Sequence, residues 1–394
     1  MVGSPNVRLV DLFPTNEPVP DQMIGRQLAV SELTTALTEG LHELVAGPRR
    51  NGKTTVCQAA MNRVRDEPGY YVVEVDLFTL ADLGELAHQL AASLVGNRAG
   101  WRRGAHALRS AAQSAAGLAP VIASAKLKAS WGADVELALN PGLAKRDPRG
   151  SFEKALVMMQ SAAERDGKHV VLYIDEFQEV AGPRQMFGDP DSTTQLMRGV
   201  LQQSHNVTCL FAGSVAHMMR DLFDDERRAF YKFGAWYDLP PITDEEWAEG
   251  LAERFERGGR PISEAGITDL LRSGESQARM VMLLAQQSFL AAVLADDGRV
   301  TTEHTTAAME LAMRADAAAL EKDVEHLREL GRHAFPVCRA IALGEPPYRL
   351  GPPPRVKSAI DALMGAGFIE QRGTPGRGGW VVIDPLLRRK LAEL

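Results

Sequence analysis

A glycine-rich loop carries the most specific chemistry in this sequence. Residues 47–54 read Gly-Pro-Arg-Arg-Asn-Gly-Lys-Thr and match the phosphate-loop pattern G-x-x-x-x-G-K-[ST] at every fixed position. In this pattern, backbone N–H groups and a helix N-terminus surround phosphate oxygens, while the lysine reaches the β- and γ-phosphates. The expected phosphate-binding residues are Gly47, Pro48, Arg49, Arg50, Asn51, Gly52, Lys53, Thr54 and Thr55, and Thr54 is also an expected Mg²⁺ ligand. The alternative is a chance match on a glycine-rich turn.

Two carboxylates follow a second apolar run. Residues 170–174 read Val-Val-Leu-Tyr-Ile and lead directly into Asp175 and Glu176. Asp175 would hold Mg²⁺ directly or through water, and Glu176 would polarise the attacking water as a general base. Burying carboxylates is costly unless a cation compensates, which favours this interpretation over a simple helix cap. No guanine-reading N-K-x-D pattern follows, so ATP is the expected nucleotide.

These residues need a parallel sheet to position them. In the first two-thirds of the chain, short apolar runs alternate with helical patterns, which is typical of an α/β fold with a parallel sheet. Expected strands cover residues 43–46, 70–76, 170–175, 207–212 and 236–239. Expected helices cover residues 26–38, 54–66, 80–94 and 152–165. After residue 241 the strands stop, and four further helices are expected at 244–255, 264–272, 277–294 and 301–318. The stretch 95–150 fits this alternation poorly and is interpreted as a basic insertion.

The composition is that of an ordinary soluble globular protein. The 394 residues carry a net charge of −7, which excludes a globally basic nucleic-acid protein. Three scattered cysteines are too few for a disulfide framework or a zinc site. No signal peptide or membrane segment is recognised, so we expect a cytoplasmic protein without a membrane partner.

Several short motifs resemble those of one family of ATPases. The chain is similar to AAA+ P-loop ATPases of the archaeal type, related to origin-recognition ATPases and STAND signalling NTPases. The matching pieces are Ile24-Gly25-Arg26, the phosphate loop, Ile174-Asp-Glu-Phe-Gln178, Ala212-Gly-Ser214 and Asp384-Pro385. The resemblance implies an AAA+/ASCE sheet core, a helical lid and a C-terminal winged-helix domain. The corresponding boundaries are 1–20 for an N-terminal arm, 21–243 for the core, 244–322 for the lid and 323–394 for the winged helix.

The resemblance also implies roles for single residues. Ile24, Gly25 and Arg26 match the segment that packs the adenine base; the alternative is a helix start. Ser214 matches a first sensor near the γ-phosphate, or else a turn residue. Arg279 matches the second sensor arginine of the lid, or else an exposed arginine at a helix start. Related proteins often carry an arginine at the position of Phe233, which a neighbouring residue would have to replace: Lys232, Arg227 or Arg228.

The last block has the pattern of a winged helix. Expected helices at 327–343 and 355–364 precede short strands at 368–371 and 380–383 and a closing helix at 385–393. Such a domain would bind double-stranded DNA through a recognition helix and a basic wing. The candidates are Arg355, Lys357, Arg372 and Arg377. The proline-rich run 345–354 replaces much of the expected second helix, so protein contact or docking between protomers is the alternative.

Together these features predict an ATP-binding and ATP-hydrolysing switch. Glu176, Lys53, Ser214 and Arg279 form the expected catalytic set. The first hypothesis couples nucleotide state to DNA binding. The second is a STAND-like signalling or scaffold ATPase with slow turnover that acts on protein partners, and the third is a nucleotide-binding regulator with negligible turnover. Self-association is left open.

Overall fold

The computed structural model describes residues 8–15, 17–98, 136–137, 140–182, 185–372 and 379–394. The chain divides into two compact units that are discontinuous in sequence. The sheet unit contains residues 28–46 and 56–239, and the helical unit contains residues 1–27, 47–55 and 240–394. The phosphate loop therefore groups with the C-terminal part of the chain, a division that the sequence did not predict.

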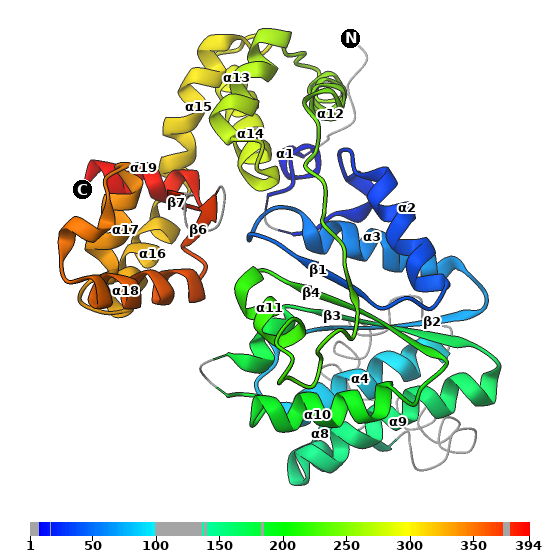
Figure 1. The fold of residues 1–394 in the computed structure, drawn as a ribbon. Helices are drawn as coiled ribbons and strands as arrows, with labels where there is room; N and C mark the ends of the chain where they lie inside the picture. The colour runs from blue at the N-terminus through cyan, green and yellow to red at the C-terminus, as the bar shows by residue number, and fades with distance from the viewer. Residues whose placement is uncertain (1–7, 16, 99–135, 138–139, 183–184, 373–378) are drawn as a thin grey trace. The chain divides into compact units, whose positions relative to one another are not determined.

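A five-stranded parallel sheet forms the centre of the sheet unit, with the order β2-β3-β4-β1-β5 (Figure 1). The strands are β1 Glu43–Ala46, β2 Tyr70–Asp76, β3 His169–Asp175, β4 Val207–Gly213 and β5 Ala235–Trp236. Every residue of β4 is buried, as is all of β3 after His169, which explains the near-continuous apolar runs in the sequence. All five predicted strands are present, although β5 ends earlier than expected.

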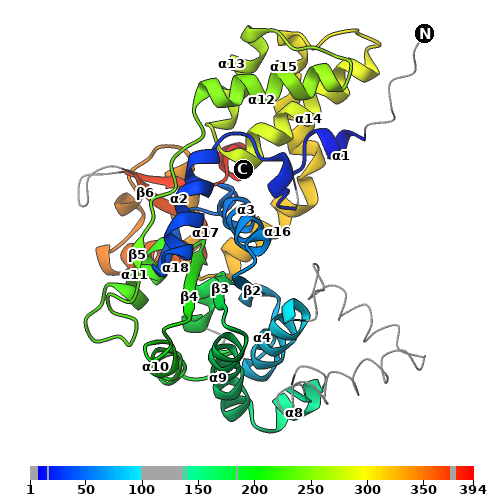
Figure 2. The ribbon, with the colours of Figure 1, turned by 90° about the vertical axis from the view of Figure 1, so that its right-hand side faces the viewer.

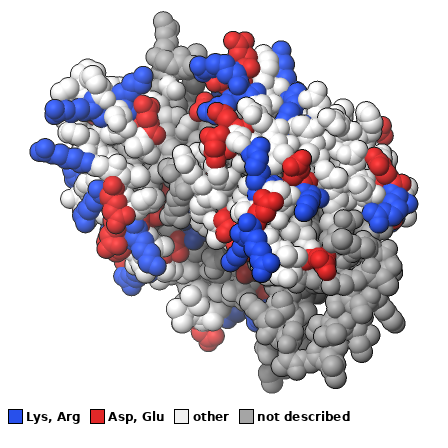
Figure 3. Space-filling view, turned by 90° about the horizontal axis from the view of Figure 1, so that it is seen from below, with Lys and Arg blue, Asp and Glu red and all other residues white. Residues whose placement is uncertain are grey.

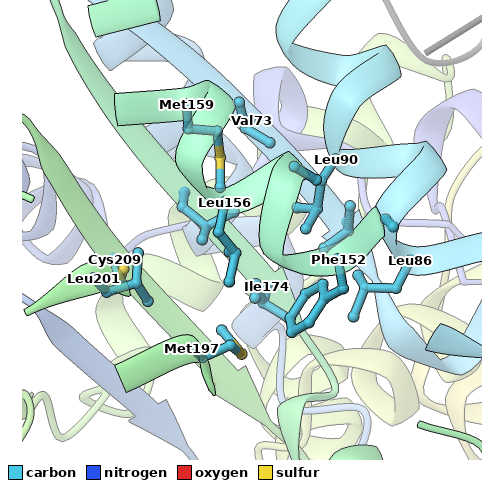
Figure 4. Packing of buried hydrophobic residues seen from close by; sticks show 14 of the residues in the cluster. Val73, Leu86, Leu90, Phe152, Leu156, Met159, Ile174, Met197, Leu201 and Cys209 are labelled. Atoms are coloured by element: carbon cyan, nitrogen blue, oxygen red, sulfur yellow. The ribbon is translucent and has the colours of Figure 1, made fainter. Parts of the chain in front are cut away.

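Helices cover both faces of this sheet (Figure 1 and Figure 2). One face carries α4 Leu83–Arg98, α8 Pro141–Arg146, α9 Pro148–Asp166 and α10 Pro190–Leu201, and the other carries α2 Gln27–Thr38 and α3 Lys53–Asp66. The short helix α11 Ala216–Phe223 follows β4. Figure 4 shows the buried contact of the first group with the sheet, where Phe152 and Leu156 of α9 pack near Ile174 of β3.

Local signals set the ends of α9 outside the predicted range 152–165. Asp147 caps the N-terminus by accepting the Gly150 N–H at 3.0 Å, and Pro148 occupies the first turn. Gly167 ends the helix with a φ of 61°, which suits glycine. The helices α4, α8 and α9 also take up both ends of the expected insertion 95–150; its residues 99–135 and 138–139 lie outside the described residues.

The helical unit contains two helical groups. The first comprises α12 Asp244–Arg257, α13 Glu264–Gly274, α14 Ala278–Leu294 and α15 Thr302–Ala315, with the N-terminal helix α1 Leu9–Leu12 and the 3₁₀ turn η1 Pro20–Gln22 nearby in the same unit. The second comprises α16 Ala317–Glu329, α17 Ala334–Ala342, α18 Pro353–Gly365, the antiparallel hairpin β6 Ile369–Arg372 and β7 Gly379–Val382, and α19 Pro385–Glu393. Among the described residues, no helix is long and apolar enough to cross a membrane.

Two expected helices of this unit were wrong in extent. The predicted helices at 301–318 and 327–343 are three helices, because the chain leaves helical geometry at Asp316 and again before α17. Gly331 has a φ of 136° in the second break, a conformation open to glycine. The expected boundary at 322/323 falls inside α16. In the proline-rich run, the 3₁₀ turn η4 Pro347–Leu350 stands where a second helix was expected.

Candidate nucleotide-binding and hydrolysis site

The two carboxylates lie where the sequence placed them, at the carboxyl end of β3. Asp175 is the last residue of β3, is 6% exposed, and pairs in register with Asp76 at the end of β2. Because β1, β3 and β4 are parallel, their carboxyl ends meet at one edge of the sheet. The phosphate loop starts at Gly47, the residue after β1, and therefore begins at this edge of the sheet.

The carboxylate of Glu176 is held by three donors. Its Oε2 accepts the Ser214 Oγ–H at 2.6 Å, the Ser214 N–H at 3.3 Å and the Gln178 side-chain N–H at 2.5 Å. The backbone of Glu176 is left-handed, with a φ of 51°, and its N–H donates to Asp175 Oδ1 at 3.0 Å. The structure therefore brings together the expected general base and the expected first sensor, and it adds Gln178, which the sequence reasoning did not single out.

Asp76 is a second residue that the sequence reasoning missed. Its pKa is raised from 3.8 to about 6, mainly by burial. The hydrogen bond from the Phe78 N–H lowers the pKa, and the carboxylates of Asp175, Glu176 and Glu179 contribute to the rise. The common feature of Asp76 and Asp175 is their position at the ends of adjacent parallel strands. The sequence indicates Asp76 only when β2 and β3 are known to be neighbours in the sheet, because each of these strands ends in an aspartate.

The phosphate loop has the backbone that its pattern predicts. Gly52 has a φ of 79°, and α3 begins at Lys53 immediately after it. The Lys53 ammonium donates to the Pro48 carbonyl oxygen at 2.7 Å, and the residue is 6% exposed. A Cβ at Gly52 would lie 3.1 Å from a terminal nitrogen of Arg26, so close packing also favours glycine there.

Arg26 reaches the phosphate loop from the segment expected to pack adenine. Its guanidinium donates to the Asn51 carbonyl at 2.5 Å and to the Pro240 carbonyl at 2.8 Å. Its backbone N–H donates to Glu246 at 3.0 Å, and Glu246 also belongs to the capping box of α12. Gly25 has a φ of 63°, and a Cβ there would lie 2.7 Å from the Glu246 carboxylate. Ile24 is buried against Gly250 of α12.

The tip of the phosphate loop contacts the C-terminal segment. The Arg50 guanidinium forms an ion pair with Asp384, whose other carboxylate oxygen caps α19 by accepting the Leu386 N–H at 2.8 Å. The neighbouring Gln277 donates from its side-chain amide to the Ile383 carbonyl at 2.6 Å. Burial, followed by the positive charge of Arg279, lowers the pKa of Arg50. The Asp384-Pro385 motif thus begins α19 and supplies a partner to the loop.

Arg279 sits beside the same loop but is paired with an acidic residue. Its backbone N–H donates to the Arg50 carbonyl at 3.3 Å, and its guanidinium forms a 2.8 Å ion pair with Asp316. Asp316 lies at the break between α15 and α16. The expected second sensor is therefore near the phosphate loop, and its partner comes from a residue that no motif indicated.

The three residues expected to replace the arginine that is missing at Phe233 have partners within the sheet unit. Arg227 forms a local ion pair with Asp225 at 2.8 Å, and Arg228 pairs with Asp191. The Lys232 ammonium lies 5.1 Å from the centre of the Tyr231 ring. The Arg227 side chain is 84% exposed and that of Arg228 is 34% exposed, so Arg227 is the more accessible of the two arginines.

The DNA-binding candidates are only partly described. Arg355 and Lys357 are exposed on α18, whose opposite side buries Val356, Ile360 and Leu363. Arg372 ends β6, and Arg377 lies outside the described residues. On the face that Figure 3 shows, Lys and Arg side chains are interspersed with Asp and Glu instead of forming one basic patch.

Comparison with known proteins shows the fold. No protein-family model matches the chain, and no curated protein does. Among solved structures, the Walker-type ATPase PABY2304 of Pyrococcus abyssi is similar, with a TM-score of 0.68 and 16% identity over 96% of this chain and 99% of that one. The ORC2 protein of Aeropyrum pernix in its ADPNP–ADP complexes has a TM-score of 0.57 and 14% identity, covering 97% of this chain and 95% of that one.

The chain has the fold of a Walker-type ATPase. The predicted α/β P-loop core is confirmed, and so is the resemblance to archaeal-type ATPases related to origin-recognition proteins, at the level of the fold. The strand order places β4 between β1 and β3, so the phosphate loop and the Asp175–Glu176 pair follow strands that are not neighbours. The similarity to the Pyrococcus abyssi structure extends over nearly the whole chain.

Proposed function

We propose that this protein is an ATP-binding and ATP-hydrolysing molecular switch that uses Mg²⁺. The observation that carries the proposal is the set of contacts around the phosphate loop. Arg50 at its tip pairs with Asp384, and the Arg50 carbonyl accepts the Arg279 N–H. A bound nucleotide phosphate would offer Arg50 a second anionic partner. Nucleotide binding and the position of the C-terminal segment are then linked through one side chain.

The chemistry is assigned to the residues predicted from the motifs. Lys53 binds the β- and γ-phosphates, Glu176 is the general base, and Ser214 and Arg279 are sensors of the γ-phosphate. Ile24, Gly25 and Arg26 are proposed to contact the base and the loop. The hydrogen bonds from Ser214 to Glu176 support this assignment because they join the proposed base to a proposed sensor.

Mg²⁺ fits the donors available. The proposed ligands, the Thr54 hydroxyl and the Asp175 carboxylate, are the hard oxygen donors that Mg²⁺ prefers. The pKa of Asp76 is raised mainly by burial, and the nearby carboxylates of Asp175, Glu176 and Glu179 add to the rise, so acidic groups are concentrated at the carboxyl ends of β2 and β3. When bound there, the ion would neutralise this charge and the charge on the phosphates. Asp175 itself would hold the ion in place.

The partner proposed for the switch is double-stranded DNA. The order of α17, α18, the hairpin β6–β7 and α19 supports a winged helix, with α18 as the recognition helix and the hairpin as the wing. Arg355 and Lys357 are exposed on α18 and would contact phosphates. Arg372 and Arg377 are the proposed wing contacts. Self-association and a cytoplasmic location remain parts of the proposal.

The test is DNA-dependent phosphate release by the full chain. Phosphate release from Mg²⁺–ATP is measured with and without duplex DNA, over a range of protein concentrations and salt. We expect DNA to bind, to stimulate release, and to lose affinity as salt rises, because several phosphate contacts release counterions. The double variant Arg355→Glu and Lys357→Glu removes the effect of DNA and keeps basal release. As a matched control, Arg389→Glu changes an exposed arginine of α19.

Other outcomes have distinct meanings. Slow phosphate release that does not change when duplex DNA is added contradicts the DNA proposal. It favours the signalling or scaffold alternative with a protein partner. No phosphate release under any condition contradicts the hydrolysing switch and leaves a nucleotide-binding regulator. A rate per protomer that rises with protein concentration indicates a site shared between copies.

A further inference from the structure

Gln178 is buried at the point where the proposed base and the proposed sensor meet. It lies in the 3₁₀ turn η3 Phe177–Ala181 after β3 and is 1% exposed. An amide group buried to this degree needs partners at both ends, because an unsatisfied buried donor or acceptor is costly. Both ends of this amide find their partners in the Glu176–Ser214 pair.

The Gln178 amide bridges Glu176 and Ser214, with its nitrogen toward the Glu176 carboxylate and its oxygen toward the Ser214 backbone. Its Nε2 donates to Glu176 Oε2 at 2.5 Å and lies 3.5 Å from Ser214 Oγ. Its Oε1 accepts the Ser214 backbone N–H at 3.2 Å. Ser214 itself donates to the same Oε2. The three side chains therefore form a closed ring of hydrogen bonds, in which Gln178 and Ser214 both donate to one oxygen of the Glu176 carboxylate.

The neighbouring glycine makes room for this amide. A Cβ at Gly213 would lie 2.6 Å from Gln178 Oε1 and 2.6 Å from two atoms of the Met219 side chain. Contact this close would displace the glutamine or the methionine. The end of β4 is therefore shaped to accept the Gln178 side chain, which explains why the run Ala212-Gly-Ser214 has glycine in the middle.

We propose that Gln178 is a positioning residue for hydrolysis, acting through Glu176. This inference rests on the proposed ATPase function. Gln178 holds the Glu176 carboxylate in one orientation and ties it to the backbone of Ser214. A general base must be held within hydrogen-bond reach of the water that it polarises, and small misplacements are costly in rate. Gln178 need not contact ATP, so its loss should lower kcat and leave nucleotide binding intact.

The test compares Gln178→Met with wild type in the full chain. Methionine has a similar length and volume but removes both hydrogen bonds. We expect kcat for Mg²⁺–ATP to fall by about 10- to 100-fold with little change in KM or in the affinity for ADP. Gln178→Leu also lacks both the donor and the acceptor, and it serves if Gln178→Met does not fold. Gln160→Met is the matched control, since Gln160 of α9 accepts the Ser204 hydroxyl at 3.0 Å.

The decisive readout is a double-mutant cycle with Glu176→Gln. If Gln178 acts through Glu176, Gln178→Met has no further effect on the residual rate of the Glu176→Gln variant. An equal fold-loss in both backgrounds overturns the inference, as does an unchanged kcat in the single variant. A wild-type chain that binds ATP but releases no phosphate overturns the ATPase proposal instead, and the two failures are therefore separable.

Discussion

The residues around Glu176 and those around Arg50 are held in different ways. The Glu176 carboxylate accepts uncharged donors from Gln178 and Ser214, which lie near it at the ends of β3 and β4. Arg50 pairs with the charged Asp384, 334 residues away along the chain. The first arrangement fixes one orientation of a reactive group. The second joins the phosphate loop to a distant segment by an ion pair that another anion can replace.

The difference suggests a division of roles. Neutral hydrogen bonds in a buried ring favour a single geometry, which suits a general base. An ion pair on a partly exposed arginine has a small net free energy, so binding of a phosphate can shift it. We therefore assign hydrolysis to the Glu176 ring and the link to the C-terminal segment to the Arg50 contact.

The largest expected effect on binding is at Lys53. Lys53→Ala removes the charge-assisted contact to the β- and γ-phosphates, and we expect ATP affinity to fall by about 10- to 100-fold. Isothermal titration calorimetry with ATP and Mg²⁺ measures the ATP affinity of wild type and variant. Lys168→Ala is a matched control, because Lys168 precedes the start of β3 and lies over the Tyr71 ring. Equal losses in both variants would count against the assignment.

A smaller effect of opposite sign is expected at Asp384. Asp384→Asn removes the charged partner of Arg50 but keeps an oxygen to cap α19. Arg50 is then more available to phosphate, and ATP affinity should rise by up to about five-fold. Asp361→Asn, at an exposed position of α18, is the control. Unchanged or weaker ATP binding by a stably folded Asp384→Asn variant would refute the proposed link.

Asp76, which pairs in register with the proposed Mg²⁺ ligand Asp175, should make the stability of the chain depend on pH. The pKa of Asp76 is raised from 3.8 to about 6, so the folded chain holds this proton more tightly than the unfolded chain does. Wild type therefore loses stability as pH rises through about 4 to 6, and Asp76→Asn does not. Without Mg²⁺, the variant should be more stable by about 1 kcal/mol above pH 7, a figure reduced for partial exposure.

Urea unfolding at pH 4 and at pH 8, in the presence of EDTA, measures this difference. The free energies of unfolding of wild type and Asp76→Asn should differ little at pH 4 and separate at pH 8. A stability difference that is the same at both pH values would show that the charge of Asp76 is not its cause.

Much of the sheet unit could be predicted because its signals are local. Apolar runs located the five strands, the glycine pattern located the phosphate loop, and Asp175 and Glu176 follow their strand directly in the sequence. Helix bounds were less accurate where a single residue decides them. The break at Asp316 and the early start of α9 at Pro148 are two such cases.

The partners of the site residues could not be predicted in the same way. Arg279 was chosen for a role beside phosphate, yet its ion pair with Asp316 depends on where α15 ends. The bond from Arg26 to Asn51 depends on two left-handed residues, Gly25 and Arg26, that turn the chain toward the loop. Such contacts join residues that are far apart in sequence, and no local pattern indicates them.

Glu176 is proposed to act as the general base in the hydrolysis of ATP bound through the phosphate loop. The most direct test measures Mg²⁺-dependent phosphate release and ATP affinity for wild type and Glu176→Gln. We expect phosphate release to fall by about 100-fold or more while ATP affinity stays within a few-fold of wild type. A Glu176→Gln variant that releases phosphate at the wild-type rate would show that Glu176 is not the general base.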